Sequence, residues 1–190
     1  MNKIGIYGGS FNPIHIGHIS LARQILSIAK LDEVWFVVSP QNPFKQNSQS
    51  LIADDIRLRL TEKALSGEEH LKVSDCEFRL PRPSYMWHTL QHLSAEYPDT
   101  EFSLIIGADN WAVFDKWYHA TDILSHHNII IYPREGYSID KTTLPPNATI
   151  VDTELYPISS TMIRQMVAQG KDISGLVADN IKDDVYKIYK

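Results

Sequence analysis

Short apolar runs alternate with amphipathic segments along the whole chain. The runs typical of buried strands occupy residues 3–8, 33–39, 71–78, 101–109, 128–136 and 148–153. Apolar periodicity predicts helices over residues 17–30, 51–66, 84–97, 158–170 and 179–190, with short helices between 110 and 125. Strands that alternate with helices predict an α/β fold with a mostly parallel sheet, because parallel neighbours need a crossover connection.

Composition narrows the class of protein. A chain of 190 residues can bury one sizeable core, and we expect a single domain over residues 1–190. No apolar run approaches the roughly 18 residues of a transmembrane helix, and the N-terminus lacks a signal-peptide core, so we expect no membrane partner and a cytoplasmic location. The net charge of −5 argues against a nucleic-acid partner. Cys76 is the only cysteine, which excludes disulfides and multi-cysteine zinc sites.

Ligand-binding residues of a parallel sheet are expected directly after its strands, at the carboxyl edge. In the first such segment, a strand is followed by Gly8 and Gly9, and then by His15 and His18 at the start of a helix. A glycine turn that leads to free helix amides can bind an anion. The pattern is neither the dinucleotide motif GxGxxG nor the P-loop GxxxxGK[ST].

His15 and His18 favour a phosphate over a metal ion. A histidine can donate a hydrogen bond to phosphate in either protonation state. A metal site would need a carboxylate or a third histidine nearby, and this stretch offers none. An ordinary loop is the alternative for either histidine taken alone. His88 and His92 stand four apart on an expected helix, but they also lack a third ligand, so we expect a solvated helix face and no zinc.

Two motifs carry a family resemblance. The stretch "GGSFNPIHIGH" resembles the GG[TS]FDPxHxGH signature of the nucleotidyltransferase α/β-phosphodiesterase superfamily, and "ISSTMIR" resembles its second signature, ISSTxIR. The resemblance implies a Rossmann-like, doubly wound, mostly parallel sheet of the HxGH nucleotidyltransferase type.

Three further segments resemble the nicotinate-mononucleotide adenylyltransferases, namely "SPQNPFK", "RPSYMWHTL" and "IIGADNWAVFDKWYHATDIL". The resemblance implies transfer of the adenylyl group of ATP to nicotinate mononucleotide, giving nicotinate adenine dinucleotide and pyrophosphate in NAD biosynthesis. The alternatives are another acceptor, nicotinamide mononucleotide or phosphopantetheine, and a non-catalytic nucleotide-binding regulator. Mg²⁺ is implied with ATP, held mainly by phosphates and water rather than by protein ligands. A homo-oligomer is an open alternative, because family members vary.

The same resemblance assigns roles to single residues. It implies a catalytic set of His18 at the α-phosphate, His15, Lys45 and Arg164. The implied ATP site consists of Gly8, Gly9, Ser10, Phe11, His15, His18, Gly107, Asp109, Arg134, Ser159, Ser160, Thr161 and Arg164. The implied nicotinate mononucleotide site consists of Ser84, Tyr85, Asp109, Trp117 and Tyr118.

Some of these residues also have simpler interpretations. Asp109, expected to bind ribose hydroxyls or help hold the metal, could instead cap the helix after Gly107. Ser159 or Ser160 could likewise only cap its helix, and Trp117 could be a core residue.

Three positions depart from the family pattern. Asn12 stands in place of an aspartate, and we expect little change because asparagine makes similar loop hydrogen bonds. Phe44 replaces a histidine before Lys45, which can remove a ligand contact. Met86 replaces the threonine of the SYT motif and leaves the preference for nicotinate over nicotinamide mononucleotide open.

Overall fold

The computed structural model describes residues 1–41 and 51–190, so the predicted phosphate contact of Lys45 lies outside the described residues. The strands form a six-stranded sheet in the order β3-β2-β1-β4-β5-β6, and adjacent strands are parallel throughout. They are β1 (Asn2–Gly9), β2 (Glu33–Val38), β3 (Leu71–Ser74), β4 (Thr100–Gly107), β5 (Asn128–Tyr132) and β6 (Ala148–Ile150). This strand order is that of a doubly wound Rossmann sheet, which confirms the predicted fold class.

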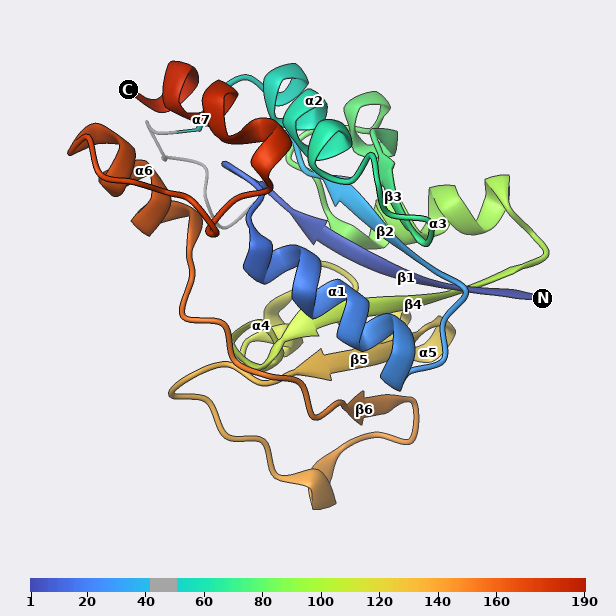
Figure 1. Cartoon of the computed structure of the whole chain (residues 1–190). Helices are drawn as coiled ribbons and strands as arrows, with labels where there is room; N and C mark the ends of the chain where they lie inside the picture. Colours follow the sequence, from blue (N-terminus) through green and yellow to red (C-terminus); the bar gives the residue numbers. More distant parts are fainter. Residues whose placement is uncertain (42–50) are drawn as a thin grey trace.

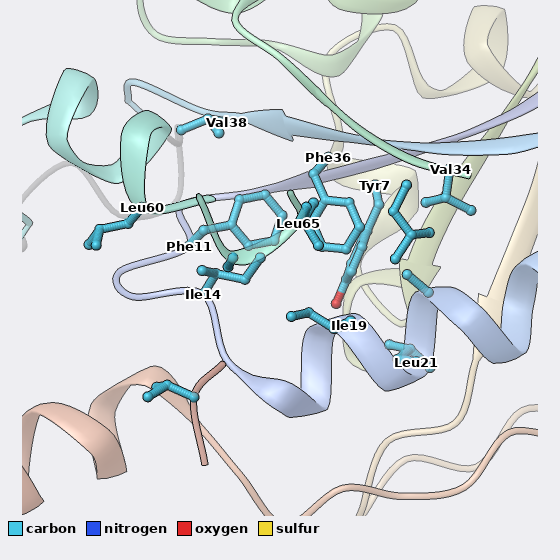
Figure 2. Packing of buried hydrophobic residues seen from close by; sticks show 14 of the residues in the cluster. Tyr7, Phe11, Ile14, Ile19, Leu21, Val34, Phe36, Val38, Leu60 and Leu65 are labelled. Atoms are coloured by element: carbon cyan, nitrogen blue, oxygen red, sulfur yellow. The ribbon is translucent and has the colours of Figure 1, made fainter. Parts of the chain in front are cut away.

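Helices cover both faces of the sheet (Figure 1). One face packs against α1 (Ile16–Ile28), α2 (Asp54–Ala64), α6 (Ser160–Ala168) and α7 (Lys182–Tyr189). The other face packs against α3 (Met86–Glu96), α4 (Ala108–Trp111) and α5 (Ala120–His126). Side chains alternate along each strand, so Ile6 and Tyr7 of β1 enter separate cores. Figure 2 shows the core that contains Tyr7, Phe11 and Phe36, which lie between the strands and α1.

Three strands are at least three residues shorter than the sequence predicts, and one of them, β6, ends at Ile150 rather than at residue 153. β3 ends at Ser74, and the rest of the expected strand is a 3₁₀ helix, Cys76–Arg79. β5 ends at Tyr132, because Pro133 lacks the amide hydrogen that a further ladder bond would need. Other 3₁₀ helices within the described residues are Phe114–Lys116, Lys141–Thr143 and Asp179–Ile181. Within residues 1–41 and 51–190, no helix is long and apolar enough to cross a membrane.

The strand order reverses between β1 and β4. β1 pairs with β2 on one side and with β4 on the other, and the chain winds outward from this point in both directions. Sheets of this order bind ligands in the crevice outside the carboxyl ends of the strands at the reversal. The residues at those ends are Gly9 of β1 and Gly107 of β4, both from the predicted site.

Candidate active site

The loop after β1 has an unusual backbone conformation that aromatic packing holds in place. Phe11 has a φ of 44°, in the left-handed region that a bulky residue rarely adopts. Its ring is buried, with its centroid 5.7 Å from that of Tyr7 and 5.3 Å from that of Phe36 (Figure 2). A Cβ on Gly9 would lie 2.8 Å from the Phe11 ring, so the loop requires glycine there.

His15 and His18 meet at the start of α1. His15 is the N-cap residue, and its backbone amide donates to Nδ1 of His18 over 3.2 Å. The two rings stack with centroids 3.6 Å apart. Burial, helped by the positive charge of Arg134, lowers the pKa of His15 to about 4, so this ring is neutral near pH 7. Because Nδ1 of His18 accepts a hydrogen bond, the neutral His18 ring carries its proton on Nε2.

The carbonyls of this loop accept hydrogen bonds from side chains far away in the sequence. Ser160 donates from its hydroxyl to the Pro13 carbonyl over 2.8 Å. Arg164 donates from Nη1 to the Asn12 carbonyl over 2.7 Å. The two predicted site segments, 8–18 and 158–164, are therefore in direct contact, as the shared role implied by the resemblance requires.

The simpler interpretation also holds for Ser159. It is the N-cap residue of α6, and its hydroxyl accepts from the Met162 amide over 3.1 Å. The Thr161 hydroxyl accepts from Nη2 of Arg164 over 3.3 Å. The start of α6 thus lies beside the loop with its Ser159 cap formed.

A cavity of about 430 Å³ opens at the carboxyl ends of β1 and β4. It brings together four of the residues predicted to bind nicotinate mononucleotide, Ser84, Tyr85, Trp117 and Tyr118. Its other lining residues are Tyr7, Gly8, Gly9, Ser39, Glu77, Met86, Leu104, Ile105, Ile106, Gly107, Asn110, Lys116 and Tyr132. Asp109, the fifth predicted residue, is absent from this lining.

Asp109 instead lies beside Arg134. Its Oδ1 is 3.5 Å from Nε of Arg134, and both side chains are partly exposed, so the ion pair itself adds little stability. The suggestion that Asp109 caps the following helix is wrong, because Gly107 is the N-cap residue of α4. A Cβ on Gly107 would lie only 2.4 Å from Oδ1 of Asp109, so glycine makes room for this carboxylate. Asp109 and Arg134 therefore form one charged pair at the end of β4.

Aromatic side chains form part of the cavity wall. The Tyr85 and Tyr118 rings are 4.7 Å apart, and Tyr118 remains half-exposed at the rim. Trp117 packs on Phe114 with centroids 5.4 Å apart, so it belongs both to the core and to the cavity wall. Met86 packs over the sheet end, because a Cβ on Gly8 would lie 2.7 Å from its Cε.

Sequence reasoning missed Glu77, a buried carboxylate in the cavity wall. Its Oε1 accepts from the Thr89 hydroxyl over 2.7 Å, and burial raises its pKa despite the neighbouring hydroxyls. Among the described residues, Oε2 of Glu77 and the Ser84 hydroxyl make no hydrogen bond of good geometry, but the Ser39 and Ser84 hydroxyls lie close enough to the carboxylate to lower its pKa. The sequence feature that could have revealed Glu77 is the presence of a glutamate within a segment predicted to be a buried strand, since glutamate is rarely buried without a partner.

Sequence reasoning also missed Arg57, which is fully buried on α2. It donates to the carbonyls of Ser39 (2.9 Å), Ile52 (3.0 Å) and Ser10. Ser10 follows β1, Ser39 follows β2 and Ile52 precedes α2, so this one side chain links the three segments. The sequence feature that could have revealed Arg57 is the position of an arginine on the apolar face of an amphipathic helix.

His88 and His92, the other histidine pair, have neighbours of other kinds in the structure. Nε2 of His92 lies 3.1 Å from Oε2 of Glu96 on the same helix. His88 packs against the rings of Tyr85 and Tyr118. In the described part of the chain, no group of three or more His, Cys, Asp or Glu residues could hold a metal ion.

Comparisons with known proteins agree on one family. The model of the cytidylyltransferase-like family matches residues 6–166. A probable nicotinate-nucleotide adenylyltransferase of Bacteroides fragilis is 54% identical over 171 residues, which cover 90% of this chain and 85% of that protein. A probable nicotinate-nucleotide adenylyltransferase of Flavobacterium johnsoniae is 41% identical over 181 residues, which cover 94% of this chain and 93% of that protein.

Solved structures agree on the fold. Plasmodium falciparum nicotinic acid mononucleotide adenylyltransferase complexed with NaAD matches with a TM-score of 0.81 and 20% identity, covering 100% of this chain and 98% of that one. The same enzyme complexed with APC matches over the same shares, with a TM-score of 0.80 and 20% identity. At this level of identity the likeness concerns the fold alone, and it extends over the whole chain.

Proposed function

Because the chain belongs to the cytidylyltransferase-like family and, within it, to the nicotinate-nucleotide adenylyltransferases, we propose that it joins ATP and nicotinate mononucleotide into nicotinate adenine dinucleotide, with release of pyrophosphate. The observation that carries this proposal is the position of the cavity. Its aromatic wall suits a flat pyridine ring, and its floor at Tyr7 and Gly9 borders the loop that leads to His15 and His18.

The reaction needs positioning more than covalent help from the protein. An oxygen of the mononucleotide 5′-phosphate forms a bond to the α-phosphorus of ATP. The bond from that phosphorus to the oxygen that bridges to the β-phosphorus breaks, and pyrophosphate leaves with the electron pair. We assign His18 to the α-phosphate, where its Nε2–H can donate to an oxygen whose charge grows in the transition state.

The ATP site in this proposal lies on the loop after β1 and the start of α6. Gly8, Gly9, Ser10 and Phe11 supply backbone groups next to the reacting phosphate. The free amides at Ser160 and Thr161 suit the β- and γ-phosphates, because a helix N-terminus attracts anions. Arg164 contributes positive charge here while one of its nitrogens holds the loop. His15 acts as a neutral donor, and Asp109 with Arg134 faces the nucleoside at the end of β4.

The mononucleotide site in this proposal is the cavity itself. Trp117 offers the largest flat surface for the pyridine ring, and Tyr85 and Tyr118 close its other side. Ser84, whose hydroxyl is buried, supplies a polar group for the ring substituent or the ribose. Met86 contributes an apolar contact beside Gly8, so discrimination between the acid and the amide depends on backbone groups and on Ser84.

A magnesium ion is expected to arrive with ATP. Mg²⁺ keeps several waters and is usually bound through substrate phosphates and one or two carboxylates, and Asp109 is a carboxylate at this edge of the sheet that could contribute. When bound, the ion would neutralise charge on the phosphates. The role of Lys45, the cytoplasmic location, the single domain, the oligomeric state and the lack of a nucleic-acid partner stay predictions.

Pyrophosphate release tests the proposal most directly. The enzyme is incubated with ATP and Mg²⁺, and nicotinate mononucleotide, nicotinamide mononucleotide and phosphopantetheine are compared as acceptors. We expect release with the first acceptor to exceed release with the others. Comparable release with the amide would indicate dual specificity, and release with phosphopantetheine alone would contradict the proposal. ATP binding without release from any acceptor would favour the non-catalytic regulator.

A further inference from the structure

Three helices hold the loop that follows β1. Arg57 from α2 and Arg164 and Ser160 from α6 donate hydrogen bonds to its backbone carbonyls. The fourth contact comes from α7, at the end of the chain, where the Tyr189 hydroxyl donates to Oδ1 of Asn12 over 2.7 Å. This is the only one of the four contacts that reaches a side chain of the loop.

The donor lies in a segment without a recognisable motif. The family model ends at residue 166, whereas α7 begins at Lys182. Burial raises the pKa of Tyr189 well above its ordinary value, although the positive charges of Arg164 and Arg57 act in the opposite direction. The hydroxyl therefore keeps its proton at neutral pH and serves as a donor. Arg57 and Arg164, which both donate to the loop after β1, thus lie close to Tyr189.

We propose that Tyr189 is a positioning residue for the ATP-phosphate site, and that it acts by holding Asn12 in the loop that leads to His15 and His18. The inference rests on the proposed function. Asn12 follows directly after Phe11, whose left-handed backbone is strained for a bulky residue and persists only where the surroundings hold it. Without the Tyr189 hydroxyl the loop spends more time in other conformations, and the catalytic histidines lose their fixed placement.

A matched pair of substitutions tests this role. Tyr189→Phe removes the hydroxyl and keeps the ring. Tyr186→Phe makes the same change on the same helix, but the Tyr186 hydroxyl accepts from the Ile173 amide (3.1 Å) and lies away from the loop. We expect Tyr189→Phe to lower kcat/KM for ATP by roughly five- to tenfold, as for the loss of one neutral hydrogen bond. The KM of Tyr189→Phe for the mononucleotide should stay within about twofold of the wild-type value. All kinetic constants of Tyr186→Phe should stay within the same range.

A double-mutant cycle separates positioning from a general loss of stability. If the contact carries the effect, Tyr189→Phe should change kcat/KM for ATP little further in an Asn12→Ala background. Additive losses would overturn the proposal. An unchanged kcat/KM for ATP in Tyr189→Phe would also overturn it. The same holds if Tyr189→Phe and Tyr186→Phe lose equal kcat/KM and the losses run parallel to the decrease in their melting temperatures.

A binding measurement keeps the inference separate from the proposed function. Titration of Mg²⁺–ATP into the wild-type protein and Tyr189→Phe reports the loop without any reaction. If no acceptor yields pyrophosphate, the proposed function fails, but an ATP dissociation constant raised roughly fivefold in Tyr189→Phe would still support the role of Tyr189. Equal dissociation constants in that case would overturn it.

Discussion

At the scale of single residues, His15 and His18 differ in environment although their rings stack. His15 is buried, while His18 is half-buried beside the rings of Tyr7 and Phe11. Since the His18 proton lies on Nε2, we expect His18→Ala to lower turnover by about 100-fold or more, in the range known for loss of one charge-stabilising donor. ATP affinity, measured by calorimetry, should fall by less than about tenfold.

His70→Ala is the control for this substitution. His70 is exposed and lies 3.1 Å from the Asp32 carbonyl at the opposite edge of the sheet, so its removal should leave turnover unchanged. Equal losses of turnover and ATP affinity in His18→Ala would contradict a role in the transition state.

Trp117 serves the acceptor rather than ATP in our proposal. We expect Trp117→Ala to raise the KM for nicotinate mononucleotide by about tenfold, because a stacking surface is lost, with a much smaller change in the KM for ATP. Trp111→Ala removes a tryptophan from the same region outside the cavity lining, so it controls for lost packing. An unchanged KM for the mononucleotide in Trp117→Ala would exclude the stacking role.

At the scale of elements, the start of α1 links stability to pH through His15. Its pKa of about 4 in the folded state lies below the ordinary value of 6.5, so below pH 6.5 the unfolded chain binds a proton that the folded chain does not. Stability therefore falls as the pH drops from 6.5 toward 4, by about 2 kcal/mol between pH 7 and pH 5. Urea unfolding at both pH values should show this loss, and His15→Gln should reduce it.

The same comparison has an internal check. Burial also lowers the pKa of His127, so part of the pH dependence will persist in His15→Gln. An identical pH dependence in the wild-type protein and the variant would show that His15 does not titrate as its burial indicates.

Sequence patterns predicted the elements well where a local rule decides. The apolar runs located all six strands of the sheet, and the Ser159 cap and Gly170 bracket α6. The predicted end of β3 was wrong, because the chain forms a 3₁₀ helix from Cys76 onward, and this helix places the Glu77 carboxylate at the cavity. Apolar character alone cannot show such a turn, since Phe78 and Cys76 suit a strand equally well.

At the scale of the whole molecule, the site depends on contacts between segments far apart in the sequence. The family resemblance identified the two signatures, but Arg57, Glu77 and Tyr189 carry no motif, and only the placement of α2, of the 3₁₀ helix after β3 and of α7 shows their positions. Whether a buried polar side chain has a partner is decided by tertiary structure, so periodicity could not reveal these three residues.

Arg57 provides the strongest test of this dependence on distant contacts. It is fully buried and donates to three carbonyls, so its loss removes the donor from the buried Ser39 carbonyl and from the partly buried carbonyls of Ser10 and Ile52. We expect Arg57→Met to lower the free energy of unfolding by about 3 kcal/mol or more. Urea unfolding measures this change.

Arg59→Met is the matched control, because it makes the same substitution two residues along α2, at an exposed side chain that pairs with Asp55 one turn away. Exposed pairs of this kind contribute at most about 0.5 kcal/mol. Arg57→Lys keeps the charge but loses the planar fork that reaches several carbonyls, so it should recover only part of the stability. If Arg57→Met and Arg59→Met had equally small effects, the ends of β1 and β2 would be held by the sheet alone, and the loop that carries the phosphate site would not need the buried cation.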